Sequence, residues 1–228
     1  MGCAEKEMAG LAATSVMLGF AAGLFRNPLT GEGCRYLASL DLASKDVVLS
    51  QEECRVGLAA MRDFCSGGTE ADVLHRANVT FHRLFVGPHH VPCPPWGSVY
   101  LDGGRLFGPS ALEVAHELER HGFAIPEGTH EPSDHAAYEL AFFGECLGNA
   151  ATAWQRDDDV AAQAFEKDAL SFLERYIEPW FSEFASKVRE EDAGGLYEGL
   201  VVLTCGLLGF ARTLLGDADK CAANNMMW

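Results

Sequence analysis

A cluster of prolines near the middle of the chain most constrains what it can fold into. Four of the nine prolines fall within GPHHVPCPPWGSVY, residues 87–100. Proline removes a backbone donor and fixes φ, so this segment cannot be the interior of a helix. Long ordered loops inside compact helical domains are unusual and often functional. The cluster therefore predicts a structured central loop and marks a candidate functional surface.

Helical periodicity dominates the sequence on both sides of this loop. After Thr69, apolar residues recur at intervals of three and four, and Thr69 with Asp72 can cap the start of that helix. Ser50 and Ser110 each begin an S-x-x-E capping pattern, and Gly122 is a natural stop for the helix after Ser110. The pattern predicts helices that begin near these three capping sites.

The remaining segments complete an all-α prediction. A long helix is expected over 159–178, and Pro179 should bend or restart it into a helix over 180–190. The last major helix is predicted over 196–215. Only GSVYLDGG, residues 97–104, looks locally extended, and one short strand does not make a sheet.

These elements predict a single globular helical domain of about eight to ten helices. It has an N-terminal helical part over about 1–86, a proline-rich loop over 87–104 and a C-terminal helical part over about 105–228.

The charge balance argues against nucleic-acid binding. There are 33 acidic and 17 basic side chains, which gives a net charge of −16. Nonspecific nucleic-acid binding depends on clustered Lys and Arg facing phosphates, and this balance opposes it. An acidic surface suits a basic partner, or it simply keeps the protein soluble. Both readings stay open on charge alone.

Two uncharged segments, residues 8–25 and 199–211, test the expectation of a soluble protein. The first approaches the roughly 20 apolar residues of a membrane span, but it is rich in Ala and Gly. It also follows MGCAEKE, which is not the basic start of a signal peptide. Glu198 and Arg212 bracket the second too tightly for a span. Both are predicted to be buried core helices of a cytoplasmic protein with no membrane span and no export signal of its own.

The stretch EPSDHAAYEL, residues 131–140, raises the question of catalysis. Glu131, Asp134 and His135 are residue types that act as general acids and bases. The alternative is a helix start, because Pro132 is favoured in a first turn and acids are stabilised near a helix N-terminus. With Pro132 opening the helix and Asp134 in its first turn, most of this stretch is explained without a reaction. We therefore predict no catalytic residue.

Metal and nucleotide signals are weak. Four of the eight histidines lie in 116–135, and His89 and His90 lie in the loop, but none forms H-E-x-x-H or a comparable spacing. The eight cysteines contain no C-x-x-C pair, and free thiols suit a reducing cytosol. GGRLFGP matches neither the P-loop nor the dinucleotide fingerprint. We predict no metal and no cofactor.

A peptide-binding surface fits the residues better. Residues 113–145 hold eight acids against one base, Arg120. An acidic rim around an apolar floor would suit a peptide with a basic end and an apolar stretch, bound as a helix in a groove. Core packing is the open alternative for the floor. The candidate floor residues are Phe81, Leu84, Phe85, Trp96 and Tyr100.

The same stretches carry a family resemblance. FHRLFVGPHHVPCPPWGSVYLD (81–102), RLFGPSALEVAHELERHGF (105–123) and EPSDHAAYEL (131–140) resemble the TorD/DmsD family of redox-enzyme maturation chaperones, and most closely its DmsD-like branch. The motifs L-F-x-G-P, P-P-W-x-S-V-Y, F-G-P-S and E-P-x-D-H occur in that order. The similarity is densest over about 78–147, and the helical pattern on either side fits the family along most of the remainder.

The resemblance implies an all-helical cytoplasmic chaperone and not an enzyme. Family members bind the twin-arginine signal peptide of a molybdopterin-containing oxidoreductase subunit and hold that subunit back from export until its cofactor is inserted. The resemblance also implies that a homodimer can form by domain swapping across the central loop. A twin-arginine signal has a basic region followed by an apolar region, which suits an acidic rim and an apolar floor.

Carried over by position, the family's peptide-binding surface includes Asp134 as the charge partner of a signal-peptide arginine. His135 is expected to bond the peptide or to orient Asp134. Phe81 stands where the close branch often has tryptophan, so an indole N–H is missing there. The other implied residues are Leu84, Phe85, Trp96, Glu131 and Pro132.

Two rival functions remain at this point. One is a hydrolase or metalloenzyme that uses Glu131, Asp134 and His135. The other is a helical adaptor that binds a folded partner and no signal peptide.

Overall fold

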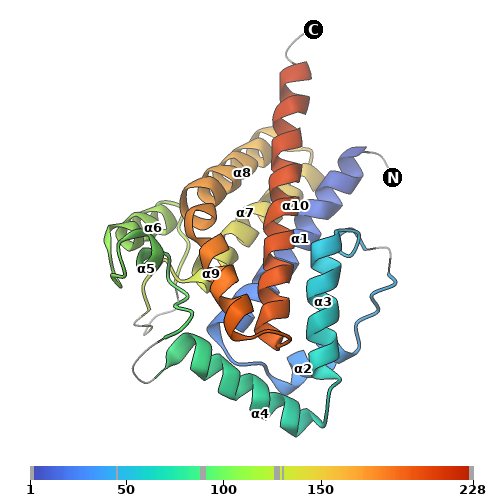
Figure 1. Ribbon diagram of the computed structural model, residues 1–228. Coiled ribbons are helices and arrows are strands. Elements are labelled where there is room, and N and C mark those ends of the chain that lie inside the picture. Colours follow the sequence, from blue (N-terminus) through green and yellow to red (C-terminus); the bar gives the residue numbers. More distant parts are fainter. Residues whose placement is uncertain (1–2, 45, 88–90, 126–128, 130, 226–228) are drawn as a thin grey trace.

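The computed structural model shows helices packed around one core (Figure 1). It describes residues 3–44, 46–87, 91–125, 129 and 131–225. Within these residues the α-helices are α1 (Cys3–Arg26), α2 (Gly31–Ala38), α3 (Glu52–Cys65), α4 (Glu70–Phe81), α5 (Gly97–Leu101), α6 (Pro109–Arg120), α7 (Ala136–Gln155), α8 (Asp159–Phe172), α9 (Glu178–Glu191) and α10 (Leu196–Asn225). Two π-helical segments, η1 (His82–Val86) and η2 (Leu173–Ile177), continue α4 and α8. The described residues form no strand, and the all-α prediction is confirmed.

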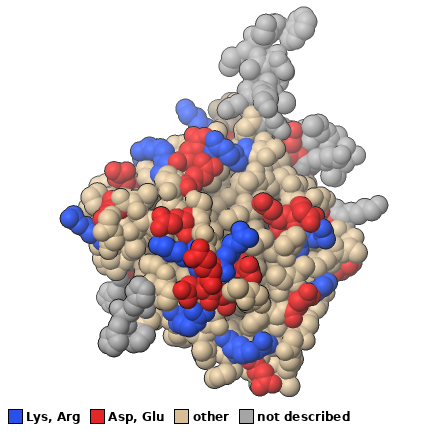
Figure 2. Space-filling model, viewed as in Figure 1, with Lys and Arg blue, Asp and Glu red and all other residues tan. Residues whose placement is uncertain are grey.

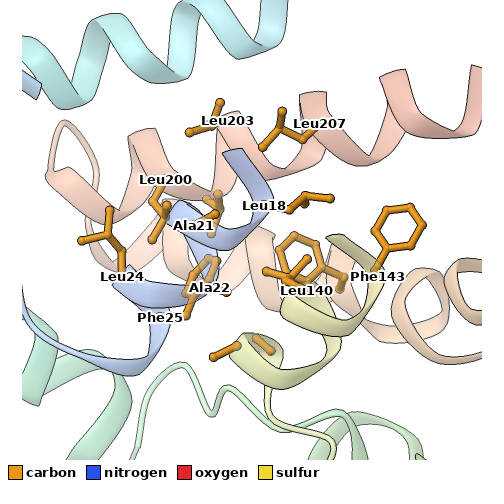
Figure 3. Packing of buried hydrophobic residues seen from close by; sticks show 14 of the residues in the cluster. Leu18, Ala21, Ala22, Leu24, Phe25, Leu140, Phe143, Leu200, Leu203 and Leu207 are labelled. Atoms are coloured by element: carbon orange, nitrogen blue, oxygen red, sulfur yellow. The ribbon is translucent and has the colours of Figure 1, made fainter. Parts of the chain in front are cut away.

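The centre of the core is built by α1, α7 and α10 (Figure 3). Helix α1 packs along α7, and α10 packs against α1, α3 and α9. Leu18 on α1, Leu140 on α7 and Leu200 on α10 are fully buried, and each contributes about 1.5–3 kcal/mol on leaving water. The core cluster also includes residues that precede the proline-rich loop, such as Val73 and Phe81. Both helical parts therefore share this core.

The two uncharged segments supply much of this core. Glu7–Arg26 and Leu196–Gly216 are each long and apolar enough to cross a membrane, and 44% and 56% of those windows are buried inside the protein. The prediction that they form core helices is confirmed by the burial of Leu18 and Leu200.

Glycines allow α3 and α10 to approach each other closely. A Cβ placed on Gly57 would lie 2.4 Å from the backbone nitrogen of Leu203, well inside contact distance. Gly199, on the facing helix, would place a Cβ 3.0 Å from the carbonyl oxygen of Gly57. Only glycine fits at so close a helix–helix contact, so Gly57 and Gly199 set the distance between α3 and α10.

Helix ends follow the predictions in some places and depart in others. Thr69 caps α4 by accepting from the backbone N–H of Asp72, as predicted. The prediction of a capping box at Ser50 is wrong. The Ser50 hydroxyl donates to the carbonyl of Asp46, and α3 begins at Glu52 without a side-chain cap. Ser110 is not a cap either, because α6 begins one residue earlier with a proline in its first turn. Gly122 ends α6 with a φ of 69°, as expected.

Two other segments are informative. The π-helical η2 lies directly before α9, whose first turn contains Pro179, so the helix restarts there as predicted, after a local widening. The expectation of an extended segment over 97–104 is wrong, because Gly97–Leu101 forms α5. The reason is a long-range cap that the local sequence does not contain. The final helix also extends beyond residue 215 to Asn225.

Candidate functional site

The second half of the proline-rich loop crosses the segment that precedes α7. The backbone N–H of Gly97 donates to the carbonyl of Asp134 at 3.0 Å, and that of Ala136 donates to the carbonyl of Pro95 at 2.8 Å. These bonds make an isolated antiparallel bridge between Trp96 and His135. The P-P-W-x-S and E-P-x-D-H motifs are therefore held side by side. We call this junction of residues 94–98 and 131–136 the crossing.

Asp134 is a buried residue of the crossing, and its side chain caps α5. Its Oδ2 accepts from the backbone N–H of Ser98, and its side chain is 1% exposed. Burial raises the pKa of this carboxyl, while its hydrogen bonds with Ser98 oppose that shift. Asp134 was expected in the first turn of its own helix, but α7 begins only at Ala136, so the carboxylate serves a different helix. Pro132 is also buried.

His135 is the N-cap of α7. Its Nδ1 accepts from the backbone N–H of Ala137 at 3.0 Å, so that nitrogen carries no proton. Burial lowers the pKa of His135 to about 4, and the positive charge of Arg26 adds to the effect. The imidazole is therefore neutral near pH 7. It is not a cationic acid at that pH, and its free electron pair on Nδ1 is already used by the backbone.

Trp96 and Glu131 form the exposed part of the crossing. The Trp96 indole N–H donates to Glu131 Oε2 at 2.9 Å, and its ring packs edge-on against the ring of His135 at 5.8 Å. Trp96 is half-buried and Glu131 is exposed. An exposed carboxylate oriented by the N–H of a half-buried indole ring is suited to a guanidinium group.

Glu139 is a second buried carboxyl at this junction, and sequence reasoning missed its role. Its Oε2 accepts from the Trp180 indole N–H at 3.0 Å, and its side chain is 1% exposed. Burial, and next the nearby Asp134 carboxylate, raise the pKa of Glu139 well above its usual value. The signal available in the sequence was an acid inside the otherwise apolar run AAYELAFF.

Trp180 in turn packs against the loop from below. A Cβ placed on Gly97 would lie 2.9 Å from Trp180 Nε1, so glycine is needed at the start of α5. The ring of Tyr100 stacks on Trp180 with centroids 5.4 Å apart, and the Tyr100 hydroxyl donates to the carbonyl of Pro94 at 2.9 Å. The Lys187 ammonium lies over the Tyr100 ring, 4.6 Å from its centroid. Tyr100 thus fastens α5 to α9.

The remaining candidate floor residues lie in the core. Phe81, Leu84 and Phe85 are 6%, 0% and 3% exposed. The Phe85 ring contacts those of Phe25 and Tyr197 edge-on, at 6.1 Å and 5.1 Å. Core packing, the alternative left open by the sequence, is what the structure shows for these three side chains. They pack within the core and do not face solvent.

The predicted acidic rim is reduced for the same reason. Of the eight acids in 113–145, Asp134 and Glu139 are buried, and Glu127 lies outside the described residues. Glu117 is paired with Arg120 and His121. On the face seen in Figure 2, acidic and basic side chains lie interspersed and do not form a field of one sign. Glu131 is the exposed carboxylate at the crossing itself.

The structure also bears on metal and thiol chemistry. Across the described part of the chain, no group of three or more His, Cys, Asp or Glu residues could hold a metal ion. His89, His90 and His130 lie outside the described residues. Burial raises the pKa of the Cys93 thiol, next to the crossing, to about 12, so it is protonated and unreactive.

A cavity of about 380 Å³ lies elsewhere, between α1, α2, α3 and the segment that joins α2 to α3. Its lining includes Val16, Met17, Tyr36, Asp41 and Asp46. It contains no residue of the crossing.

Comparison with known proteins gives consistent matches. The family profile described as Nitrate reductase delta subunit matches residues 50–186. The Tat proofreading chaperone DmsD of Salmonella typhimurium is 31% identical over 121 residues, which is 53% of this chain and 52% of that protein. The chaperone protein TorD of Vibrio cholerae is 29% identical over 129 residues, or 56% and 57% of the two chains. TorD of Shewanella loihica is 29% identical over 143 residues, or 60% and 61%. The chain thus spans little more than half the length of these relatives.

Proposed function

Because the chain belongs to the family described as Nitrate reductase delta subunit, the TorD/DmsD family, we propose that it is a chaperone for an exported molybdoenzyme. It binds the twin-arginine signal peptide of a molybdopterin-containing oxidoreductase subunit in the cytoplasm, and it holds the apo subunit until the cofactor is inserted. The observation that carries the proposal is the crossing, which brings two separate family motifs together at one exposed carboxylate.

Glu131 is the residue we assign to the arginines. It is exposed, and the Trp96 indole N–H at 2.9 Å orients its carboxylate. Guanidinium groups bind carboxylates in a bidentate manner and stack on indole rings, and a lysine ammonium reproduces neither geometry. The proposed pair therefore favours arginine over lysine.

The buried residues of the crossing act by positioning this pair. Asp134 holds the start of α5 through Ser98, and His135 starts α7 beside the Trp96 ring. We propose that Asp134, at 1% exposure, influences peptide binding through the placement of Trp96 and Glu131, in place of the direct arginine contact expected from sequence. Pro132 and Tyr100 belong to the same support, as do the buried side chains of Phe81, Leu84 and Phe85.

Calorimetric titration with a twin-arginine leader peptide tests the proposal. We expect a Kd of about micromolar or tighter, which weakens as salt rises because the chain carries a net charge of −16. The same peptide with both arginines replaced by lysine should bind more weakly. The peptides to test are the twin-arginine leaders of molybdoenzymes encoded next to this chain's gene. If the protein binds none of them, the proposal that it recognises such a leader is refuted.

A pull-down with the client subunit lacking its leader separates this function from the adaptor reading. A chaperone that recognises the leader retains much less of the truncated client than of the full one. Equal retention of both forms would favour an adaptor for a folded partner.

The homodimer is a separate part of the proposal. Exchange of the helices that follow residues 87–104 between two copies would preserve the contacts of α1 with α7 and α10, since these join the two parts of the chain. Light scattering after size-exclusion chromatography distinguishes a dimer from a monomer.

A further inference from the structure

Exposed apolar side chains concentrate beside the crossing. Of the ten large apolar residues that are exposed in the described chain, four lie between residues 101 and 112. They are Leu101, Leu106, Phe107 and Leu112, with exposures of 42%, 45%, 60% and 60%. They come from the end of α5, the turn that follows and the start of α6, and we call them the 101–112 patch. These helices project from the side of the molecule in Figure 1.

The turn that carries the patch is held in a defined shape. Asp102 Oδ2 accepts from the backbone N–H of Ser110 at 3.0 Å and also from the Ser110 hydroxyl, which closes the turn. Phe107 has a φ of 60°, a left-handed conformation that costs a residue with a side chain about 1 kcal/mol or more. Strain of this kind persists where the surrounding structure enforces it, often at functional sites. The chain thus keeps a strained phenylalanine in solvent, where it contributes nothing to the core.

The patch adjoins the residues that we assign to the arginines. Helix α5 begins at Gly97, directly after Trp96, and Leu101 is its last residue. At 1.5 Å per residue, Leu101 lies about 7 Å along the helix from Trp96. Helices α5 and α6, which carry the two ends of the patch, contact each other. Exposed apolar patches on soluble proteins often mark interaction sites. Phe81, Leu84 and Phe85, which the sequence predicted as the apolar floor, are buried. They cannot contact the apolar part of a bound peptide, so that part must bind elsewhere.

We propose that the 101–112 patch binds the apolar stretch that follows the arginines of the signal peptide, while Trp96 and Glu131 bind the arginines themselves. The inference rests on the proposed function and identifies where the second half of the same ligand lies. An apolar stretch of ten residues in a helix is about 15 Å long, which is enough to continue from the crossing along α5 onto α6.

Two substitutions test the patch without loss of the fold. Phe107→Asn removes the ring, and asparagine tolerates the left-handed backbone better than phenylalanine does. Leu112→Gln removes a second apolar side chain from the exposed face of α6. Val160→Gln is the matched control, since Val160 is 81% exposed at the start of α8.

The measurement is fluorescence anisotropy with two labelled peptides, the full leader and a short peptide that ends after the arginines. We expect Phe107→Asn and Leu112→Gln each to weaken binding of the full leader roughly tenfold, the effect of losing one buried apolar side chain. The short peptide should bind these variants as it binds the unmodified protein. Val160→Gln should alter neither affinity.

The outcomes separate the two levels of the proposal. If the unmodified protein binds the leader and both patch variants bind it equally well, the patch assignment is overturned and the proposed function stands. If the unmodified protein does not bind the leader, both fall. A leader with a photoreactive benzophenone in its apolar stretch should label residues 101–112. Labelling of the cavity beside Val16 and Met17 instead would also overturn the assignment.

Discussion

The core and the crossing are built on opposite principles. At the centre of the core, α1, α7 and α10 meet through side chains such as Leu18, Leu140 and Leu200, which carry no charge in any state. The crossing and the first turn of α7 that follows it bury three ionisable side chains, Asp134, His135 and Glu139. Burial favours the neutral form of each side chain, so it raises the pKa of the two acids and lowers the pKa of the histidine.

The difference indicates what each region does for the protein. Apolar burial stabilises a fold without requiring one particular geometry, whereas a buried polar group costs free energy unless its hydrogen bonds are made. Asp134, His135 and Glu139 each make one such bond, to Ser98, Ala137 and Trp180 in turn. The second oxygen of each carboxyl, Asp134 Oδ1 and Glu139 Oε1, is buried without a partner. The core therefore secures stability, and the crossing fixes the placement of Trp96 and Glu131.

The largest expected effect breaks the core. Gly57→Ala places a Cβ against the backbone of α10, and we expect a loss of about 3 kcal/mol in the free energy of unfolding, at the upper end for overpacking. Gly209→Ala is the control on the facing helix, because its Cβ would meet nothing within 4 Å. That change should gain up to about 1 kcal/mol from helix propensity. Urea denaturation measures both, and equal effects would contradict the close α3–α10 contact.

The next effect breaks the crossing. Asp134→Ala leaves the Ser98 N–H without its acceptor in a buried site, and we expect a loss of about 2 kcal/mol. Asp134→Asn keeps an oxygen for that N–H and should recover most of the loss. Thermal unfolding of the two variants provides the comparison. If alanine and asparagine behave alike, the cap on α5 does not stabilise the protein.

A smaller effect is expected at the start of α7. His135→Ala removes the cap and should cost about 1 kcal/mol, whereas His135→Asn retains an acceptor for Ala137. The pKa of His135 is lowered to about 4 in the folded protein from its usual 6.5, so the unfolded chain binds the proton more readily. The unmodified protein should therefore lose stability as pH falls from about 6.5 to 4, relative to His135→Asn. Parallel stability curves over that range would show that His135 is not buried as described.

The smallest effect is a change of slope at higher pH. The pKa of Glu139 is raised, so the folded state holds a proton that the unfolded chain releases above about 4.5. Stability therefore falls as pH rises from that value through the folded pKa. Glu139→Gln cannot ionise and keeps an oxygen for Trp180, so its stability should decline less over the same range. Chemical denaturation at several pH values measures the two slopes, and identical slopes would contradict the raised pKa.

The sequence predicted the parts of this molecule that depend on neighbours along the chain. Periodicity located the helices, the uncharged segments indicated the core, and the prolines marked the loop. The motifs also singled out Trp96 and Glu131, whose side chains are hydrogen-bonded to each other in the structure. It failed where partners are distant: Asp134 caps a helix 36 residues away, so α5 was mistaken for an extended segment. The burial of Phe81 and Leu84 was equally beyond a local pattern, since an aromatic residue on a helix face can serve a groove or a core.

The central claim is that Glu131 receives an arginine of the signal peptide, and a double-mutant cycle tests it most directly. The cycle combines Glu131→Gln in the protein with arginine-to-glutamine replacements in the peptide, and each affinity is measured by calorimetry. Because glutamine still accepts from Trp96, the substitution removes the charge and retains the indole contact. We expect a coupling energy of roughly 1 kcal/mol between Glu131 and one arginine, and a smaller coupling at higher salt. Additive losses with no coupling to either arginine would contradict it.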